Sequence, residues 1–426
     1  MIDINDLRQR PQAYKDACSK KRIEFDVDSF LALDAARRAL QGEVEKLRAA
    51  QNAASKEIPK LQGEEKTKKL EDMKSIAASA KERDEEYQKV QSQWEKDQLR
   101  IPGIPLDRVP QGKDDTENVE ISRWGEQPKF SFRPKSHIEL GKDLGLMDFE
   151  RGVKIAGARN YFLIGDGARL QHAVLSFTID HLLKKGFTLM EPPHIVNYLA
   201  MMGTGYFPGG EEQAYHLDER DDKFLIGTSE VSVASFHANE ILRLEELPKR
   251  YVGYSPCYRR EAGSYGKDTQ GLYRIHQFYK VEQVVICEAS LETSLKLHAE
   301  ILKNAEEVVQ ALGLPYRVVD VCTGDMGQGQ VYKNDIECWM PSRNSYGETH
   351  SCSTLLEFQA RRLSIKYKDK DGKNKFCHTL NNTCIASPRI LIPIIENNQN
   401  ADGSVEIPAA LRPFMGNQEK ITRAAV

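Results

Sequence analysis

Arginine, aromatic and carboxylate side chains lie close together in two neighbouring strand-like segments of this chain. The first segment ends in Tyr258-Arg259-Arg260-Glu261, and because strand side chains alternate, Arg259 and Glu261 point to the same side. One face of the second segment carries Arg274, His276, Phe278, Lys280 and Glu282. Burying such a set is costly unless a ligand satisfies it. A guanidinium offers two donors to phosphate oxygens and a phenyl ring offers a flat face to a base, so the segments predict a nucleotide site.

The loop between these segments, residues 262–273, contains Gly263, Gly266 and Gly271 beside Lys267 and Asp268. Glycines permit sharp bends, so the loop is predicted to turn a β-hairpin over something polar. For an isolated Arg-x-Glu the alternative is an ordinary solvated strand of mixed charge, because a motif this short is weakly specific.

The whole run from residue 258 to 282 resembles motif 2 of class II aminoacyl-tRNA synthetases, and in detail that of seryl-tRNA synthetases. The family pattern FRxE is present as Tyr258–Glu261, AGSxGxDTxGLxRxHQF as Ala262–Phe278, and KVE as Lys280–Glu282. The resemblance implies an α+β fold: a class II antiparallel sheet flanked by helices, with an N-terminal antiparallel helical coiled-coil arm.

The same resemblance assigns residues to ATP. Arg259 is expected to grip the α-phosphate and Arg389 to reach the γ-phosphate, which makes these two the expected catalytic residues. Phe278 and Arg389 are expected to sandwich the adenine, with Glu261 at its edge. The full expected ATP-binding set is Arg259, Arg260, Glu261, Arg274, Phe278, Glu348, Thr349, His350, Ser351 and Arg389.

A second set of residues resembles the family's serine pocket. Thr228-Ser229-Glu230 corresponds to its TxE motif, and on one side of a strand the hydroxyl of Thr228 and the carboxylate of Glu230 can hold an ammonium group. Taken alone, Thr-Ser-Glu would instead indicate the start of a helix. The resemblance implies that the serine site consists of Thr228, Ser229, Glu230, Arg259, Glu282 and Thr383.

Glu348 and Ser351 fall where the family places its metal contacts, and a carboxylate with a hydroxyl suits Mg²⁺, which prefers hard oxygen ligands. A lone Glu in such a strand is more often a surface residue. His350 departs from the usual serine. The run around Arg389 resembles motif 3, but Pro388 replaces the usual glycine, so we expect an altered turn without lost function.

Two heptad patterns near the N-terminus predict an antiparallel helical hairpin. Apolar residues repeat every seven positions at Leu33, Leu40, Leu47 and Ala54, and after a break at 59–63 at Met73, Ala80, Tyr87, Trp94 and Ile101. Such heptads usually form a dimerising coiled coil or a spacer. The resemblance instead implies an arm that holds the long variable arm of tRNA(Ser), with Arg48, Lys56 and Lys60 as expected contacts to phosphates.

Prolines and polar composition divide the chain into an N-terminal tRNA-binding domain over 1–105, a linker over 106–130 and a catalytic domain over 131–426. Pro102, Pro105 and Pro110 end the second helix, because proline blocks helix continuation. The segment 186–196 resembles class II motif 1, a helix leading to a strand, with Pro193 as its proline. That motif implies a homodimer, although an ordinary buried helix–strand pair has the same pattern.

Composition limits the remaining possibilities. The chain has 426 residues, 29% charged side chains and a net charge of −3, so any RNA contact must come from local patches. Its eight cysteines have no CxxC spacing and indicate reduced thiols. The spacing of Cys352, Cys377, His378 and Cys384 matches no zinc pattern. No signal segment or membrane span is expected, which predicts a cytoplasmic protein without membrane contact.

The resemblance to seryl-tRNA synthetases implies that the chain ligates L-serine to tRNA(Ser) with ATP and Mg²⁺, and selenocysteine tRNA is a further candidate substrate. The glycines at 324, 327 and 329 do not form GxGxxG, so a Rossmann site is not supported. One alternative is an amino acid:carrier-protein ligase, whose relatives lack the arm. The other is a non-catalytic RNA-binding paralogue, which would be expected to lack Arg259, Glu261 or Arg389.

Overall fold

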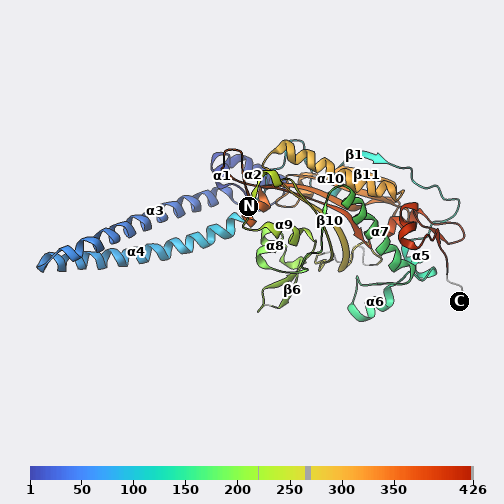
Figure 1. Cartoon of the computed structure of the whole chain (residues 1–426). Coiled ribbons are helices and arrows are strands. Elements are labelled where there is room, and N and C mark those ends of the chain that lie inside the picture. The colour runs from blue at the N-terminus through green and yellow to red at the C-terminus, as the bar shows by residue number, and fades with distance from the viewer. Residues whose placement is uncertain (219, 264–269, 424–426) are drawn as a thin grey trace. The chain divides into compact units, whose positions relative to one another are not determined.

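The two heptad segments form two long helices. The computed structural model describes residues 1–218, 220–263 and 270–423, and the chain divides into two compact units, Met1–Ile104 and Pro105–Val426. In the first unit, α3 (Val27–Glu57) and α4 (Gly63–Gln98) pack along each other as a hairpin (Figure 1). Two short helices, α1 (Ile4–Gln9) and α2 (Pro11–Lys20), precede them. The predicted helical arm is therefore confirmed.

An N-terminal cap begins α3, and apolar residues of the heptad pattern pack α3 against α4. The Asp26 carboxylate caps α3 by accepting from the Ser29 N–H at 3.0 Å. Val44 and Ala54 of α3 and Ala80 of α4 are buried in the seam. Ala36, which lies three residues after Leu33 and is therefore expected beside the seam in a heptad pattern, is exposed. Arg37 lies there instead, with its Cζ 4.3 Å from the centre of the Trp94 ring.

A carboxylate that the heptad pattern does not predict joins three helices of this unit. Asp34 is fully buried, and it accepts two hydrogen bonds from Arg8 of α1, at 2.8 and 2.9 Å. The Trp94 indole N–H donates to the same carboxylate at 3.1 Å, and Arg38 donates at 3.2 Å. Burial alone would raise the pKa of Asp34, but hydrogen bonding and charge from these arginines lower it.

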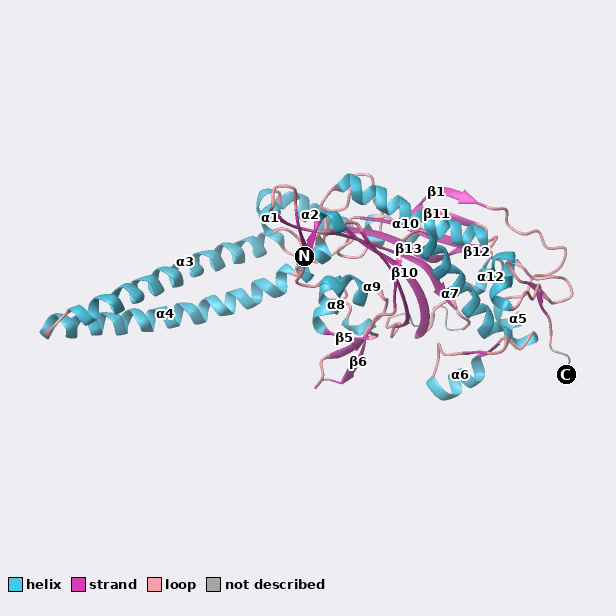
Figure 2. Ribbon diagram, viewed as in Figure 1, coloured by secondary structure: helices cyan, strands magenta, loops and turns pink. Residues whose placement is uncertain are grey.

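The second unit is built around an eight-stranded sheet in the order β1-β11-β12-β13-β16-β10-β9-β4 (Figure 2). All neighbours are antiparallel except β4 and β9. The strands span β1 (Val119–Trp124), β11 (Tyr316–Asp320), β12 (Tyr332–Met340), β13 (Ser345–Leu356), β16 (His378–Ser387), β10 (Gln277–Cys287), β9 (Lys249–Tyr258) and β4 (Thr188–Met190). The predicted antiparallel class II sheet is confirmed. In the loop between β9 and β10, the predicted residues Gly266, Lys267 and Asp268 lie outside the described residues.

Helices α7 (Asp166–Lys184) and α10 (Leu291–Ala311) pack on the sheet, and α12 (Leu391–Asn397) packs on β12. Because side chains alternate along a strand, one face of the sheet packs against these helices and the second face points away from them. Gln283 of β10 and Asn382 of β16 both donate to the Ile301 carbonyl of α10, at 2.9 and 2.6 Å. Their neighbours Glu282 and Thr383 therefore face the other side of the sheet.

Smaller elements complete this unit. One three-stranded sheet contains β5 (Ile195–Asn197), β7 (Lys223–Leu225) and β6 (Tyr215–Asp218), and another contains β15 (Asn374–Phe376), β14 (Lys366–Lys368) and β8 (Ile241–Arg243). Two two-stranded sheets pair β2 (Met147–Asp148) with β3 (Phe162–Leu163), and β17 (Val405–Glu406) with β18 (Lys420–Ile421). The remaining helices are α5 (His137–Asp143), α6 (Phe149–Ala156), α8 (Tyr198–Thr204), α9 (Glu230–Ala234) and α11 (Phe358–Leu363).

The segment 106–130 contributes to the sheet, since β1 lies within it and pairs with β11. Val109 also packs with Val319 and Val321 in a small apolar cluster. Across the described part of the chain, the helices are too short or too polar to cross a membrane. All eight cysteines are buried free thiols.

Candidate active site

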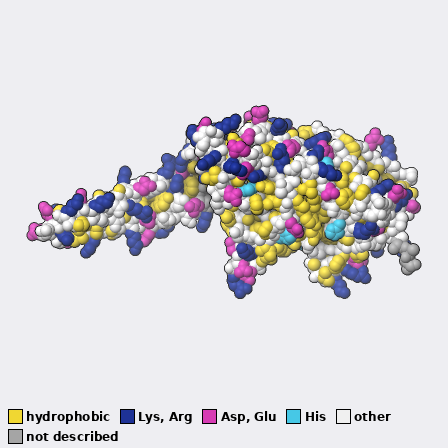
Figure 3. All heavy atoms as spheres, in the orientation of Figure 1, with side chains coloured by type: hydrophobic (Ala, Val, Ile, Leu, Met, Phe, Trp, Pro, Cys, Tyr) yellow, Lys and Arg dark blue, Asp and Glu magenta, His cyan; other side chains and the backbone are white. Residues whose placement is uncertain are grey.

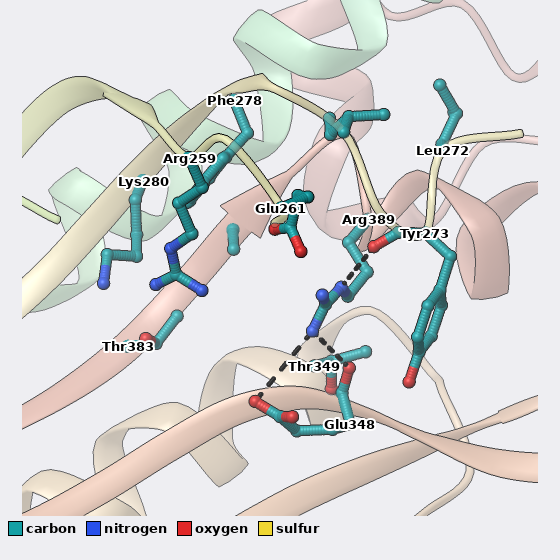
Figure 4. Close-up of a pocket in the computed structure, with 12 residues that line it drawn as sticks. Arg259, Glu261, Leu272, Tyr273, Phe278, Lys280, Glu348, Thr349, Thr383 and Arg389 are labelled. Carbon is teal, nitrogen blue, oxygen red and sulfur yellow. Dashed lines mark hydrogen bonds and ion pairs between the residues drawn. The ribbon is translucent and has the colours of Figure 1, made fainter. Parts of the chain in front are cut away.

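A pocket opens on the second face of the sheet, where β10, β13, β16 and the segment that follows β9 contribute side chains (Figure 4). Arg259 and Glu261 follow β9, and Arg389 lies between β16 and α12. The residues that line the pocket are Arg259, Glu261, Leu272, Tyr273, Ile275, Phe278, Lys280, Glu348, Thr349, Thr383, Ala386 and Arg389. Two guanidinium groups from segments 130 residues apart therefore share one cavity.

Arg259 is held from both sides. Its Nε donates to the Gly227 carbonyl at 3.2 Å, and its Cζ lies 5.2 Å from the centre of the Phe278 ring. In Figure 4 the head of Arg259 points into the cavity beside Lys280. A preoriented cation of this kind can stabilise charge that develops on a phosphate.

Arg389 lies on the other side of the pocket. Its Nε donates to the Tyr273 carbonyl at 2.9 Å, and its Nη1 donates to the Glu348 carbonyl at 3.1 Å. Its Cζ lies 4.5 Å from the centre of the Tyr273 ring. Arg389 thus stacks on Tyr273, whereas Phe278 lies under Arg259. The adenine sandwich expected between Phe278 and Arg389 stays a prediction. Pro388, directly before it, follows a cis peptide bond.

The other residues expected to bind ATP are not all brought together. Glu261 lines the pocket and pairs with Arg274, whose Nη1 lies 2.9 Å from Glu261 Oε2. The side chain of Arg260 is exposed, and its backbone N–H donates to the Gln213 carbonyl at 3.0 Å. Strand β9 ends at Tyr258 and Glu261 has a φ of 52°, so the strand expected to continue through Glu261 is wrong, and strand alternation does not set the direction of Arg260.

A buried polar cluster adjoins the two arginines. Glu282 is fully buried, and its Oε2 accepts from Thr383 Oγ1 at 3.1 Å and lies 2.7 Å from Lys280 Nζ. Its Oε1 accepts from Asn381 Nδ2 at 3.0 Å. The same Nδ2 donates to Glu230 at 3.2 Å, so one amide bridges two carboxylates. This cluster offers acceptors and donors to a small polar ligand.

Glu230 starts α9, so the expected strand over 228–230 is wrong, and the helix start that Thr-Ser-Glu indicates by itself is present. Burial, and next the charge of Glu282, raise the pKa of Glu230 to about 7. Gln359 Nε2 donates to Glu230 at 2.7 Å. Thr228 is buried beside Glu230, whereas the Ser229 hydroxyl donates to the Gly253 carbonyl of β9 at 3.3 Å.

The segment 348–351 lies at a bulge of β13. Ile336 pairs with His350 and Glu337 with Glu348, so Thr349 is the extra residue. Glu348 lines the pocket with 46% of its side chain exposed, and the charges of Arg389 and Lys333 lower its pKa. The Thr349 hydroxyl turns away and donates to the Ile336 carbonyl at 3.1 Å.

His350 is buried behind the pocket. Its Nδ1 lies 2.7 Å from the Thr349 hydroxyl, and burial lowers its pKa to about 4. A neutral imidazole that holds the bulged Thr349 accounts physically for this departure from serine. Ser351 pairs across the strands with Asp335, a buried residue whose Oδ1 has no hydrogen-bond partner among the described residues.

Comparisons with known proteins match both units. A family model of the seryl-tRNA synthetase N-terminal domain matches residues 1–105, and one of the class II tRNA synthetase core domain (G, H, P, S and T) matches 215–398. The serine–tRNA ligase of Deinococcus radiodurans is 44% identical over 98% of both chains. That of Caldicellulosiruptor saccharolyticus is 45% identical over 98% of this chain and 99% of its own. The chain belongs to the serine–tRNA ligase family.

Solved structures of that family have the same fold. The seryl-tRNA synthetase from Pyrococcus horikoshii, complexed with ATP, is 36% identical and covers 100% of both chains with a TM-score of 0.92. The cytoplasmic serine–tRNA ligase from Naegleria fowleri, in complex with AMP, is 31% identical over 97% of this chain and 96% of its own, with a TM-score of 0.85. The resemblance inferred from motif 2 is thereby confirmed at the level of family and fold.

Sequence reasoning about this serine–tRNA ligase family member missed several pocket residues. Lys280 is on the predicted polar face of β10, so its position was visible although its pairing with Glu282 was not. Tyr273 belongs to the glycine-containing loop, where no alternation gives its direction. Asn381 and Gln359 meet Glu230 only because α11 and β16 lie beside α9, and sequence spacing carries no signal of that.

Proposed function

We propose that this chain activates L-serine with ATP to seryl-adenylate and pyrophosphate, and then transfers the seryl group to the 3′ end of tRNA(Ser). One observation carries the proposal. The pocket holds two separated guanidinium groups, Arg259 and Arg389, next to a buried cluster of Glu282 and Thr383. The first arrangement suits a folded triphosphate, and the second suits a small amino acid with a hydroxyl.

In the first step, a carboxylate oxygen of serine attacks the α-phosphorus of ATP. A new P–O bond forms, the bond from the α-phosphorus to the bridging oxygen breaks, and pyrophosphate leaves with that electron pair. The substrate supplies the nucleophile, so the protein contributes position and charge. Arg259 neutralises the α-phosphate and Arg389 the γ-phosphate, while Phe278 and Glu261 hold the base.

Serine selection follows from the polar cluster. The serine hydroxyl donates to Glu282 and contacts Thr383, and the ammonium group lies toward Thr228 and Glu230. Alanine lacks the hydroxyl and leaves these groups unpaired, which in such pockets discriminates by as much as ~10⁴–10⁵. Threonine adds only a methyl group, so steric exclusion alone must reject it.

Glu348 and Ser351 would hold Mg²⁺. The donor set fits this hard cation, since a carboxylate and a hydroxyl lie close to Asp335, whose buried Oδ1 lacks a partner among the described residues. Bound Mg²⁺ would neutralise phosphate charge and orient the triphosphate. Arg389 and Lys333, which lower the pKa of Glu348, keep this carboxylate ionised before any cation binds.

The hairpin unit is proposed to bind tRNA(Ser), with residues 1–105 as the tRNA-binding domain, 106–130 as a linker that also supplies β1 to the sheet, and 131–426 as the catalytic domain. Arg48, Lys56 and Lys60 are exposed on the hairpin, where basic and acidic side chains are interspersed (Figure 3). Arg48 Nη2 lies 3.0 Å from Asp84, so phosphate would compete with that carboxylate. Each neutralised phosphate makes binding more salt-dependent.

A homodimer is proposed through the motif 1 region. Leu189, Ile195 and Leu199 are exposed apolar residues on β4, β5 and α8, with 43%, 53% and 42% of their surface accessible. Large exposed apolar residues mark interaction sites where they form one surface. A cytoplasmic location is proposed because the reaction uses ATP and tRNA and all eight thiols are free.

The test is ATP–pyrophosphate exchange with each amino acid, followed by charging of tRNA(Ser) and, separately, of selenocysteine tRNA. We expect exchange with serine well above alanine and glycine, and transfer of serine to tRNA(Ser). Exchange without transfer to any tRNA, but with transfer to a carrier protein, would favour the amino acid:carrier-protein ligase. Absence of exchange with every amino acid would favour a non-catalytic RNA-binding protein.

A further inference from the structure

Lys280, which lies next to Glu282 in the buried polar cluster, has no role in the function proposed above. Lys280 retains 6% side-chain exposure, and its Nζ lies 2.7 Å from Glu282 Oε2. Burial alone would lower the pKa of Lys280, but the charges of Glu282 and Cys257, together with the hydrogen bond to Glu282, raise it. Lys280 therefore lines the pocket as a cation, in contact with the buried Glu282 behind it.

The hydrogen bonds that Glu282 already accepts determine how many of its acceptor sites remain for a ligand. An ionised carboxylate has about four acceptor sites. Lys280 and Thr383 contact Oε2, and Asn381 contacts Oε1, so three donors come from the described residues. The fourth acceptor site, on Oε1, has no donor among the described residues; because Glu282 is fully buried, a ligand donor reaches that site past Thr383 and Lys280, which line the pocket. The hydroxyl of a bound amino acid has one hydrogen to donate to it.

If no cation lay nearby, the buried surroundings of Glu282 would favour the neutral, protonated form of its carboxyl group. Glu282 is fully buried, and Asn381 Nδ2 ties it to a second carboxylate, Glu230. A buried carboxylate without a cation is strongly unfavourable and takes up a proton instead. A protonated Glu282 would donate a hydrogen bond and lose its preference for a hydroxyl donor. Lys280 opposes that change.

We propose that Lys280 is a positioning residue for amino-acid selection, which pairs with Glu282 Oε2 and thereby keeps Oε1 as an open acceptor for the substrate hydroxyl. This inference rests on the proposed function, since it deepens the serine specificity of the same site. Lys280 acts through Glu282. It is not assigned a contact with the phosphates, although Arg259 lies beside it in Figure 4.

The experiment compares Lys280→Met, Lys280→Arg and the control Lys375→Met in serine- and alanine-dependent exchange. Lys375 forms an ion pair with Asp369 at 3.0 Å, outside the pocket, so the control removes the same charge. In Lys280→Met we expect the KM for serine to rise and the serine-over-alanine ratio of kcat/KM to fall, each at least about tenfold. The KM for ATP should change less than about twofold, and Lys280→Arg and the control should keep the wild-type ratio.

A double variant separates this role from a structural one. If Lys280 acts through Glu282, Lys280→Met should have no further effect on the ratio in a Glu282→Gln background. The double variant also tests the inference if Lys280→Met alone fails to fold, because it removes both buried charges. Equal losses with serine and alanine would overturn the inference, since they would place Lys280 on the carboxylate or phosphate common to both reactions. A wild-type protein without serine-dependent exchange would instead refute the proposed function.

Discussion

The guanidinium of Arg389 lies over the ring of Tyr273, with Cζ 4.5 Å from the ring centre, and its Nε donates to the Tyr273 carbonyl. On the same ring, Arg343 has its Cζ at 4.2 Å from the centre. The ring, the carbonyl and Glu348 therefore set the direction of the Arg389 head. Such preorientation lowers the cost of binding a phosphate.

Removal of the Tyr273 ring should weaken ATP binding. A cation–π contact contributes about 0.5–2 kcal/mol, so Tyr273→Leu should raise the KM for ATP about 2- to 30-fold while the KM for serine stays near wild type. Tyr273→Phe keeps the ring and the backbone carbonyl and serves as the control. Steady-state exchange at varied ATP measures both. An unchanged KM for ATP in Tyr273→Leu would show that the stacking does not orient Arg389.

Arg259→Ala should abolish serine-dependent exchange while the fold survives. Loss of one preoriented donor of this kind costs on the order of 10²–10³ in rate. Arg250→Ala is the matched control, because Arg250 is on β9 but pairs with Glu300, at 2.8 Å, away from the pocket. Circular dichroism and exchange assays check the two variants. Near-normal exchange in Arg259→Ala would contradict the assignment.

Serine binding should improve as pH rises toward neutrality. The pKa of Glu230 is raised to about 7 by burial and by Glu282, so below that pH the carboxyl is protonated. The substrate ammonium favours the ionised form, so binding releases a proton and the KM for serine should fall between about pH 6 and about pH 8. Glu230→Gln should have a higher KM without this pH dependence. A dependence that persists in Glu230→Gln would assign the titration to another group.

Asp34→Ala should loosen the hairpin unit. Breaking a buried ion pair costs 3–5 kcal/mol, and since Arg8 and Arg38 keep water contact we expect about 2–3 kcal/mol. Hydrogen exchange of α3 and α4 amides should accelerate accordingly. Asp28→Ala breaks an exposed pair with Lys15 and should leave these rates nearly unchanged. Equal protection in the two variants would mean that Asp34 contributes no more than a surface pair.

Glu348→Gln should weaken the dependence on divalent cation. A neutral amide is a poorer ligand for Mg²⁺, so the concentration that half-saturates exchange at fixed ATP should rise about tenfold or more. Glu357→Gln, which affects a surface pair with Arg361, is the control. Mn²⁺ binding in the presence of a non-hydrolysable ATP analogue, followed by electron paramagnetic resonance, gives a readout independent of activity. Identical metal curves for the two variants would remove Glu348 from the site.

The helices of the hairpin and the polar face of β10 could be predicted from the sequence, because both arise from periods of neighbouring residues. The heptads of α3 and α4 and the alternation that places Phe278 and Lys280 on one face of β10 are local patterns that any packing of the chain must respect. The 25-residue run around motif 2 added the family, the fold and the chemistry expected of the site.

Only the tertiary structure decided how these groups meet. Lys280, Asn381 and Thr383 converge on Glu282 because β16 pairs with β10, and no sequence period encodes which strands pair. Thr228 to Glu230 begin a helix although their chemistry was assigned to a strand, since three residues carry no period. Asp34 can lie in an apolar seam because three arginines and the Trp94 indole donate hydrogen bonds to its carboxylate. Those partners are spread from residue 8 to residue 94, so no local pattern predicts them. Long-range pairing sets the directions of side chains, so the sequence determined which groups are available and the fold determined which of them act together.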